Sequence, residues 1–259
     1  MGEVSYRPII EEMVWSYSRI ACFRNCPYQF FRKYILREKE APRFYSSYGS
    51  FMHRLLEQYH KGELTGEEAQ IKFLFGFQKE VRGARPKPET VQNYIHQGAA
   101  YLHRLEPLPF QTVAVEKEIH FSLGEFPFVG IVDYIGRREN GGLVIVDHKS
   151  RALSPRSVRE RPTAADRALD EILRQLYLYA AAVEQEYGAL PDTLCLNCFR
   201  NMVFIEEPFR ESAYREALDW ALQSIQMILE ASDFGPLTDY FRCGSLCGLN
   251  DDCCYWNLR

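Results

Sequence analysis

Hydrophobic residues recur with a helical period at both ends of the chain and with a strand period in its middle. In residues 16–39, Ser16 and Ser18 are candidate N-caps, and Pro27 begins the stretch PYQFFRKYIL, whose apolar residues share one helical face. A second amphipathic helix, FMHRLLEQYHKG, is predicted between Ser50 as its cap and Gly62 as its end. The segment that follows is predicted to be helical and broken at two proline-rich points.

The period then changes to two. Three strands are predicted in succession, TVAVEKEIHF, FPFVGIVDYIGRR and LVIVDHKS, with an NGG turn before the last. A long helix starts near Thr163, where Asp166 completes a capping box, and ends at Gly188. A hairpin around Arg200–Asn201 and an amphipathic helix over about 210–231 precede the cysteine-rich end. A sheet flanked by helices, in an α/β or α+β arrangement, is therefore predicted.

The composition is that of a folded, soluble protein. The chain has 259 residues, of which 46% are hydrophobic, and no repeat or linker divides it, so one domain over 1–259 is expected. No apolar run reaches the roughly 20 residues that span a bilayer, and no signal peptide is evident, so a cytoplasmic protein with no membrane partner is predicted. In that compartment eight cysteines favour metal binding or structural thiols over disulfides. The net charge of −4 does not exclude a local basic channel for nucleic acid.

An aspartate and a lysine stand two residues apart at the end of the apolar strand LVIVDHKS. The strand period places Asp147 and Lys149 on the same face. If the NGG turn joins this strand to the preceding one as an antiparallel hairpin, Asp133 and Asp147 lie near one another, seven residues on either side of Asn140. Two converging carboxylates suit a hard divalent cation such as Mg²⁺, and the ammonium could position an attacking water. Taken alone, however, a D-x-K pattern more often marks a plain strand-end ion pair.

Five stretches of the chain, in order, resemble the PD-(D/E)xK nucleases, specifically the RecB-like branch that includes the nuclease domain of AddB and the CRISPR-associated adaptation exonucleases. The stretches are CPYQFFRKYIL, YGSFMHRLLE, GIVDYI with LVIVDHKS, RQLYLYAAAV and the cysteine-rich tail. The resemblance implies an α/β fold with a restriction-endonuclease-like core, in which helices flank a central mixed sheet. It further implies a helical insertion over 53–110 and a cluster-binding tail over 240–259.

The resemblance also implies which residues form the active site. The catalytic side chains, all on stretches similar to family motifs, would be Asp133, Asp147, Lys149, Gln175 and Tyr179. A Mg²⁺ or Mn²⁺ ion would be held by His53, Asp133, Asp147 and the backbone carbonyl of His148. The helical period agrees with this assignment, since Gln175 and Tyr179 stand four residues apart on one helix face.

Cysteines at both ends of the sequence complete the resemblance. They imply a 4Fe-4S cluster on Cys26, Cys243, Cys247 and Cys253. The first two tail cysteines have three residues between them, where the family usually has two, and Cys254 is an alternative to Cys253 as the last ligand. Four thiolates also suit tetrahedral zinc, although zinc sites more often use two short C-x2-C pairs. Cys22, Cys195 and Cys198 are expected to be packed thiols.

An arginine-rich loop leaves the predicted catalytic strand and leads to the long helix. The candidate nucleic-acid-binding residues in this loop are Arg151, Arg156, Arg159 and Arg161. They could hold phosphates or form an ordinary solvated surface. Tyr45 and Tyr48, near the histidine of the predicted second helix, could stack on the bases of a single strand.

Together these features predict a metal-dependent DNA nuclease, an exonuclease that acts on single-stranded DNA or DNA ends. An endonuclease or RNase of the same fold is an alternative. The rival from another class is a non-cleaving nucleic-acid-binding or assembly subunit of a repair or recombination complex. The intact set of two aspartates and a lysine argues against that rival. A helicase or recombination protein is a candidate partner.

Overall fold

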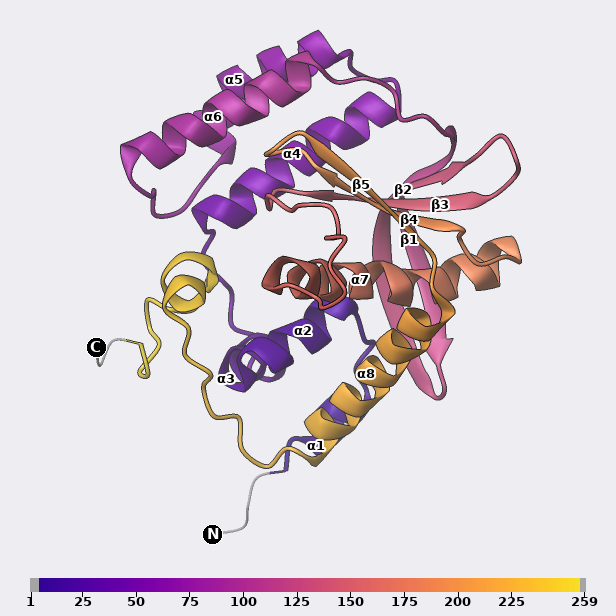
Figure 1. The fold of residues 1–259 in the computed structure, drawn as a ribbon. Helices are drawn as coiled ribbons and strands as arrows, with labels where there is room; N and C mark the ends of the chain where they lie inside the picture. The colour runs from indigo at the N-terminus through magenta and orange to yellow at the C-terminus, as the bar shows by residue number, and fades with distance from the viewer. Residues whose placement is uncertain (1–4, 257–259) are drawn as a thin grey trace.

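The protein is built around a five-stranded sheet that lies between two groups of helices (Figure 1). In this computed structural model residues 5–256 are described. The strands follow chain order across the sheet: β1 (Gln111–Leu123), β2 (Phe126–Arg137), β3 (Leu143–Lys149), β4 (Thr193–Cys198) and β5 (Val203–Pro208). β3 and β4 are parallel because the long helix α7 (Ala164–Tyr187) connects them, and the other neighbours are antiparallel. The predicted α/β fold with a mixed sheet is confirmed.

The two-residue period of the strands divides the core between the two faces of the sheet. Ile135 and Ile145 pack on one face with apolar residues of α7 and of α8 (Glu211–Glu230). Tyr134 and Val146 pack on the opposite face in a separate cluster. Cys195 and Cys198 are both fully buried and belong to different clusters. Their predicted role as packed thiols on opposite faces is confirmed.

Short helices at the N-terminal end pack beside α8. They are α1 (Arg7–Glu11), α2 (Tyr17–Asn25), α3 (Pro27–Phe30) and the π-helical turn η1 (Phe31–Ile35). Ser16 caps α2, accepting a hydrogen bond from the backbone N–H of Arg19 at 3.2 Å, and Pro27 is the first residue of α3, as predicted. Cys26 therefore lies at the junction between α2 and α3.

A separate helical layer covers the other side of the sheet (Figure 1). It consists of α4 (Phe44–His60), α5 (Gly66–Glu80) and α6 (Pro88–His103), which share an aromatic core. The predicted cap at Ser50 is wrong, because α4 begins at Phe44 and contains Ser50 in its interior. Phe44, Tyr48 and Phe51 extend the apolar stripe upstream and are buried against α5 and α6. The burial of Tyr48 also removes it from the residues that could stack on a base.

The chain ends in a segment that returns to the start of α3 and α4. This segment contains the π-helical turn η2 (Arg242–Leu246). Arg32 donates to the carbonyl of Leu249 and Arg43 to the carbonyl of Cys247, both at 2.8 Å, so the two ends of the sequence are joined by hydrogen bonds. No helix in residues 5–256 is both long enough and apolar enough to span a bilayer.

Candidate active site

The hairpin of β2 and β3 brings two aspartates together. Its register pairs Ile135 with Ile145 and Tyr134 with Val146, so the next positions, Asp133 and Asp147, face one another as the NGG turn predicted. Both carboxylates are buried, with exposures of 9% and 5%. Asp133 Oδ2 accepts a hydrogen bond of 2.7 Å from the backbone N–H of His148. Two carboxyl groups therefore lie together in a buried environment that disfavours negative charge.

Helix α4 places His53 over this strand end. Its Nδ1 lies 3.4 Å from Asp133 Oδ2. Burial opposes a charge on the imidazole, but the hydrogen bond and charge of Asp133 outweigh it, so the pKa of His53 is raised. For Asp133 burial likewise opposes ionisation, and the contact with His53 outweighs it, lowering the pKa of Asp133 to about 2. Asp133 is thus a carboxylate at neutral pH, with an imidazole beside it.

Glu116 on β1 is a third member of this group that the sequence analysis missed. Ligand atoms of His53, Glu116 and Asp133 all lie within 4.8 Å of one another. Burial and the charge of Asp133 raise the pKa of Glu116 to about 7. Its backbone has a φ of 48°, in the left-handed region that costs energy for a residue with a side chain and often marks a functional site. The sequence contains a signal for Glu116 in the two-residue turn between the first two strands. That turn pairs Leu123 with Phe126, and the same register sets Glu116 opposite Asp133.

Asp147 and Lys149 connect the strand end to α7. Lys149 Nζ lies 2.8 Å from Asp147 Oδ2 and donates to Gln175 Oε1 at 3.0 Å, and Gln175 Nε2 donates to the hydroxyl of Tyr179 at 3.0 Å. Burial disfavours the ammonium, but the charge and hydrogen bond of Asp147 prevail and raise the pKa of Lys149. Burial and the charge of Asp133 raise the pKa of Asp147 and together outweigh the opposite effect of Lys149. Asp147 is not in the close group of His53, Glu116 and Asp133.

The His148 side chain is not a member of this group, although its ring lies 5.9 Å from that of His53. Its ring stacks on His60 of α4 with 5.2 Å between centroids, and its Nδ1 lies 2.9 Å from Asn197 Nδ2. Burial lowers the pKa of His148 to about 3, so the ring is neutral. A role for its backbone carbonyl as a metal ligand stays a prediction.

The four arginines of the loop after β3 are in different environments. Arg156 is held by Glu207 at 2.8 Å and by Asp170 at 2.6 Å, two ion pairs that anchor the loop to β5 and α7. Arg159 and Arg161 are exposed on the loop. Arg151 is also exposed, two residues after Lys149. A phosphate would have to compete with two carboxylates for Arg156. Among residues 5–256, no acidic side chain forms an ion pair with Arg151, so a phosphate would meet no such competition there.

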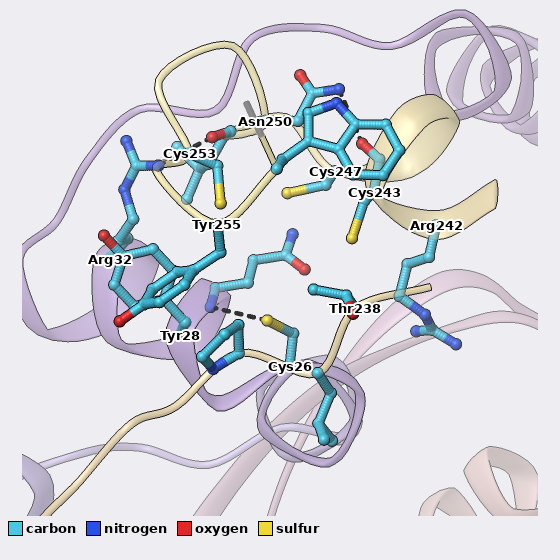
Figure 2. A pocket seen from close by; sticks show the side chains of 15 residues that line it. Cys26, Tyr28, Arg32, Thr238, Arg242, Cys243, Cys247, Asn250, Cys253 and Tyr255 are labelled. Atoms are coloured by element: carbon cyan, nitrogen blue, oxygen red, sulfur yellow. Dashed lines mark hydrogen bonds between the residues drawn. The ribbon is translucent and has the colours of Figure 1, made fainter. Parts of the chain in front are cut away.

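The cysteines implied in cluster binding surround one cavity (Figure 2). Figure 2 shows the side chains of Cys26, Cys243, Cys247 and Cys253 directed toward its centre. Cys254 does not line it and is exposed, with its sulphur 3.9 Å from the hydroxyl of Tyr28. The backbone N–H of Gln29 donates to Cys26 Sγ at 3.4 Å. Within residues 5–256, no three cysteine sulphurs lie within 4.8 Å of one another.

Comparison with known proteins decides the family. Residues 14–254 match the family model described as the PD-(D/E)XK nuclease superfamily. The chain belongs to this superfamily. No curated protein matches the sequence. The crystal structure of a candidate exonuclease from Eubacterium rectale is similar in fold, with a TM-score of 0.54 and 10% identity over 98% of this chain and 90% of that one. The crystal structure of SSO0001 is 14% identical over 96% of this chain and 94% of that one, with a TM-score of 0.38.

Proposed function

We propose that this member of the superfamily is a metal-dependent DNA nuclease of the RecB-like branch, an exonuclease that acts on single strands or DNA ends. The observation that carries the proposal is a set of neighbouring side chains from the end of β3 and from the middle of β1 and β2, with His53 of α4. His53, Glu116 and Asp133 form a close group of donors, and the Asp147–Lys149 ion pair lies beside it. Membership of a nuclease superfamily supports the assignment of that set to phosphodiester hydrolysis.

The residues at this site fit a divalent cation. Two carboxylates and an imidazole offer the oxygen-rich set that Mg²⁺ or Mn²⁺ accepts. Asp133 is ionised, and Glu116 has a pKa of about 7 because burial and that neighbouring charge outweigh the opposing charges of His53 and Lys61. A cation would offset the repulsion between them. His53, Glu116 and Asp133 would hold it, and Asp147 and the His148 carbonyl are proposed as further ligands on the family resemblance.

When bound, the metal would acidify a water molecule and polarise a phosphate oxygen. Lys149, kept charged by Asp147, would stabilise the negative charge that develops on the phosphate as the bond breaks. Gln175 holds the ammonium in place, and Tyr179 fixes the amide of Gln175. Gln175 and Tyr179 are therefore assigned as positioning residues.

The cysteine cavity supports a 4Fe-4S cluster on Cys26, Cys243, Cys247 and Cys253. A single zinc ion with thiolates at about 2.3 Å would need sulphurs about 3.8 Å apart. No three cysteine sulphurs in residues 5–256 lie within 4.8 Å of one another, and a cubane cluster, in which each thiolate binds a different iron, holds its thiolates further apart than a single zinc ion does. The position of Cys253 at the cavity, with Cys254 outside it, supports Cys253 as the fourth ligand.

Three further parts of the proposal depend on the family resemblance. The Eubacterium rectale protein, described as a candidate exonuclease, has a similar fold and is consistent with exonuclease action here. DNA as the substrate and a helicase or recombination protein as the partner are proposed from the resemblance to the RecB-like branch.

The test is cleavage of end-labelled single-stranded and double-stranded DNA with Mn²⁺, with Mg²⁺ and with chelator. We expect metal-dependent loss of the label, and at least about a hundredfold less activity in Asp133→Ala, Lys149→Ala and Glu116→Gln. Glu118→Gln is the matched control, since Glu118 is an exposed glutamate on the same strand as Glu116. Full activity in Asp133→Ala would contradict the proposed site. A protein that binds DNA and cuts it with neither metal would instead be the non-cleaving subunit.

A further inference from the structure

A groove beside the proposed active site is lined by arginines and aromatic rings from separate parts of the chain. Its volume is about 490 Å³, and its lining includes Ser150 and Arg151, directly after Lys149. Its lining also includes Phe241 and Arg242, and Arg242 lines the cysteine cavity as well. The groove therefore adjoins both the end of β3 and the cysteine cavity.

The groove carries a net positive charge. Arg151, Arg200 and Arg242 line it, and none of the three is in an ion pair with an acidic residue within 5–256. The acidic residue in its lining, Asp239, accepts a hydrogen bond of 2.6 Å from the backbone N–H of Arg242. Figure 2 shows the Arg242 guanidinium directed away from the cysteine sulphurs. Three arginines against one aspartate make the groove complementary to a polyanion.

Aromatic rings lie between these charges. The Tyr45 ring is 5.8 Å from that of Phe241 and 5.6 Å from that of Tyr94. Arg200 lies over the Tyr94 ring at 4.4 Å. Phe241 is 56% exposed although it is fully apolar. Phe241 is the exposed ring of the three, Tyr45 is half-buried and Tyr94 is buried. Accessible rings beside arginines are the combination that binds single-stranded nucleic acid, in which bases stack on rings and phosphates contact cations.

We propose that this groove binds the single-stranded part of the substrate. Phe241 and Tyr45 would stack on bases, and Arg151 and Arg242 would contact phosphates on either side of them. The inference rests on the proposed nuclease function for its substrate class. An intact duplex would not occupy the groove in this way, because paired bases are already stacked on one another and present no free face to a ring.

The test measures binding without cleavage. Fluorescence anisotropy with labelled single-stranded DNA, single-stranded RNA and blunt duplex DNA, without added divalent metal, gives affinities over a range of salt concentrations. Phe241→Ala should weaken single-strand binding about tenfold through loss of one stacking platform and leave duplex binding unchanged. Arg151→Ala should reduce the slope of log affinity against log salt on single strands by about 0.7, one phosphate contact.

Matched controls lie elsewhere on the surface. Phe75 is 87% exposed on α5, and Arg215 is an exposed arginine on α8. Phe75→Ala and Arg215→Ala should bind all three nucleic acids like the wild type. Equal melting temperatures of the four variants and the wild type would show that each variant is folded.

The outcomes separate the groove from the chemistry. If the groove variants bind single-stranded DNA and RNA more weakly to the same extent, the groove contacts bases and phosphates. If they bind only DNA more weakly, the groove also contacts the sugar. Unchanged single-strand binding in both groove variants would overturn the groove, even if the protein cuts DNA. An equal loss of duplex binding in Phe241→Ala would overturn the stacking role. If the wild type cuts nothing, yet the groove variants lose single-strand binding, the groove stands and the nuclease proposal fails.

Discussion

At the scale of single residues, Gly130 leaves room for the ring of Tyr179 because glycine has no side chain. Gly130 is three residues before Asp133 on β2, and a Cβ atom there would come within 2.6 Å of the Tyr179 ring. Tyr179 is buried, so its ring cannot swing out of the way. Because its hydroxyl holds Gln175, and Gln175 holds Lys149, the ring's place is coupled to the proposed catalytic ammonium.

Gly130→Ala should therefore reduce cleavage about tenfold or more without abolishing nucleic-acid binding, because it displaces Tyr179 and, through Gln175, the ammonium. The added methyl group should also lower the free energy of unfolding by about 1–3 kcal/mol, the usual range for an overpacked site. Steady-state kinetics should show the loss in kcat and not in KM, and urea unfolding gives the stability. Gly235→Ala is the control, since an added Cβ there meets one atom, at 3.7 Å. Wild-type kcat in Gly130→Ala would contradict the coupling.

At the scale of elements, a single carboxylate joins the start of α7 to the arginine-rich loop. Thr163 and Asp166 form the predicted capping box, and Asp166 also accepts hydrogen bonds of 2.7 Å from the backbone and side chain of Ser157. Donation from Ser157, and then from Thr163, holds the pKa of Asp166 well below its usual range. The ionised form is thus favoured in the folded protein, and α7 starts at a position that local chemistry defines.

Asp166→Ala should lower the urea midpoint at neutral pH, because four hydrogen bonds to the carboxylate are lost. A carboxyl group whose pKa falls on folding stabilises the protein fully above its unfolded pKa, about 3.9, and loses that stabilisation progressively as the pH falls from there toward the lower pKa of the folded state. The difference between wild type and variant should therefore shrink below about pH 4. Urea titrations from pH 7 to pH 3 measure it, with the exposed Asp219→Ala as control. A difference that stays constant to pH 3 would refute this linkage.

At the scale of the whole molecule, the cysteine cavity joins residues that are more than two hundred positions apart in the sequence. Cys26 lies between α2 and α3, and the other three cysteines lie in the C-terminal segment. A cofactor held by all four would restrict the unfolded chain and stabilise the fold. The hydrogen bonds of Arg32 and Arg43 to the same segment already align it.

Protein purified without oxygen should be brown and contain about four irons per chain, measured by visible absorption and metal analysis. Serine variants of the four cavity cysteines, Cys26, Cys243, Cys247 and Cys253, should lose nearly all of that iron and melt at a lower temperature. Cys254→Ser should keep the iron because its sulphur lies outside the cavity, and the buried Cys195 gives a second control. Stoichiometric zinc without iron would refute the cluster and leave the stapling role intact.

Much of the active-site strand pair could be predicted from the sequence because short turns and caps act locally. The NGG turn set the register that brings Asp133 and Asp147 face to face. The two-residue turn between β1 and β2 likewise sets Glu116 opposite Asp133. The capping box and Gly188, which has a φ of 74°, likewise determined both ends of α7.

The tertiary structure decided everything that depends on distant partners. Burial of Phe44 and Tyr48 against α5 and α6 moved the start of α4 upstream of the local signal at Ser50. The packing of α4 over the sheet brought His53 to Asp133. Ion pairs with Glu207 and Asp170 neutralise Arg156, so its charge is not available to a phosphate as the sequence had suggested. The groove likewise joins segments that no local pattern relates. Hydrogen bonds in turns and caps act within a few residues and can be read from the sequence, whereas side-chain packing and charge pairing depend on which surfaces the folded chain brings together.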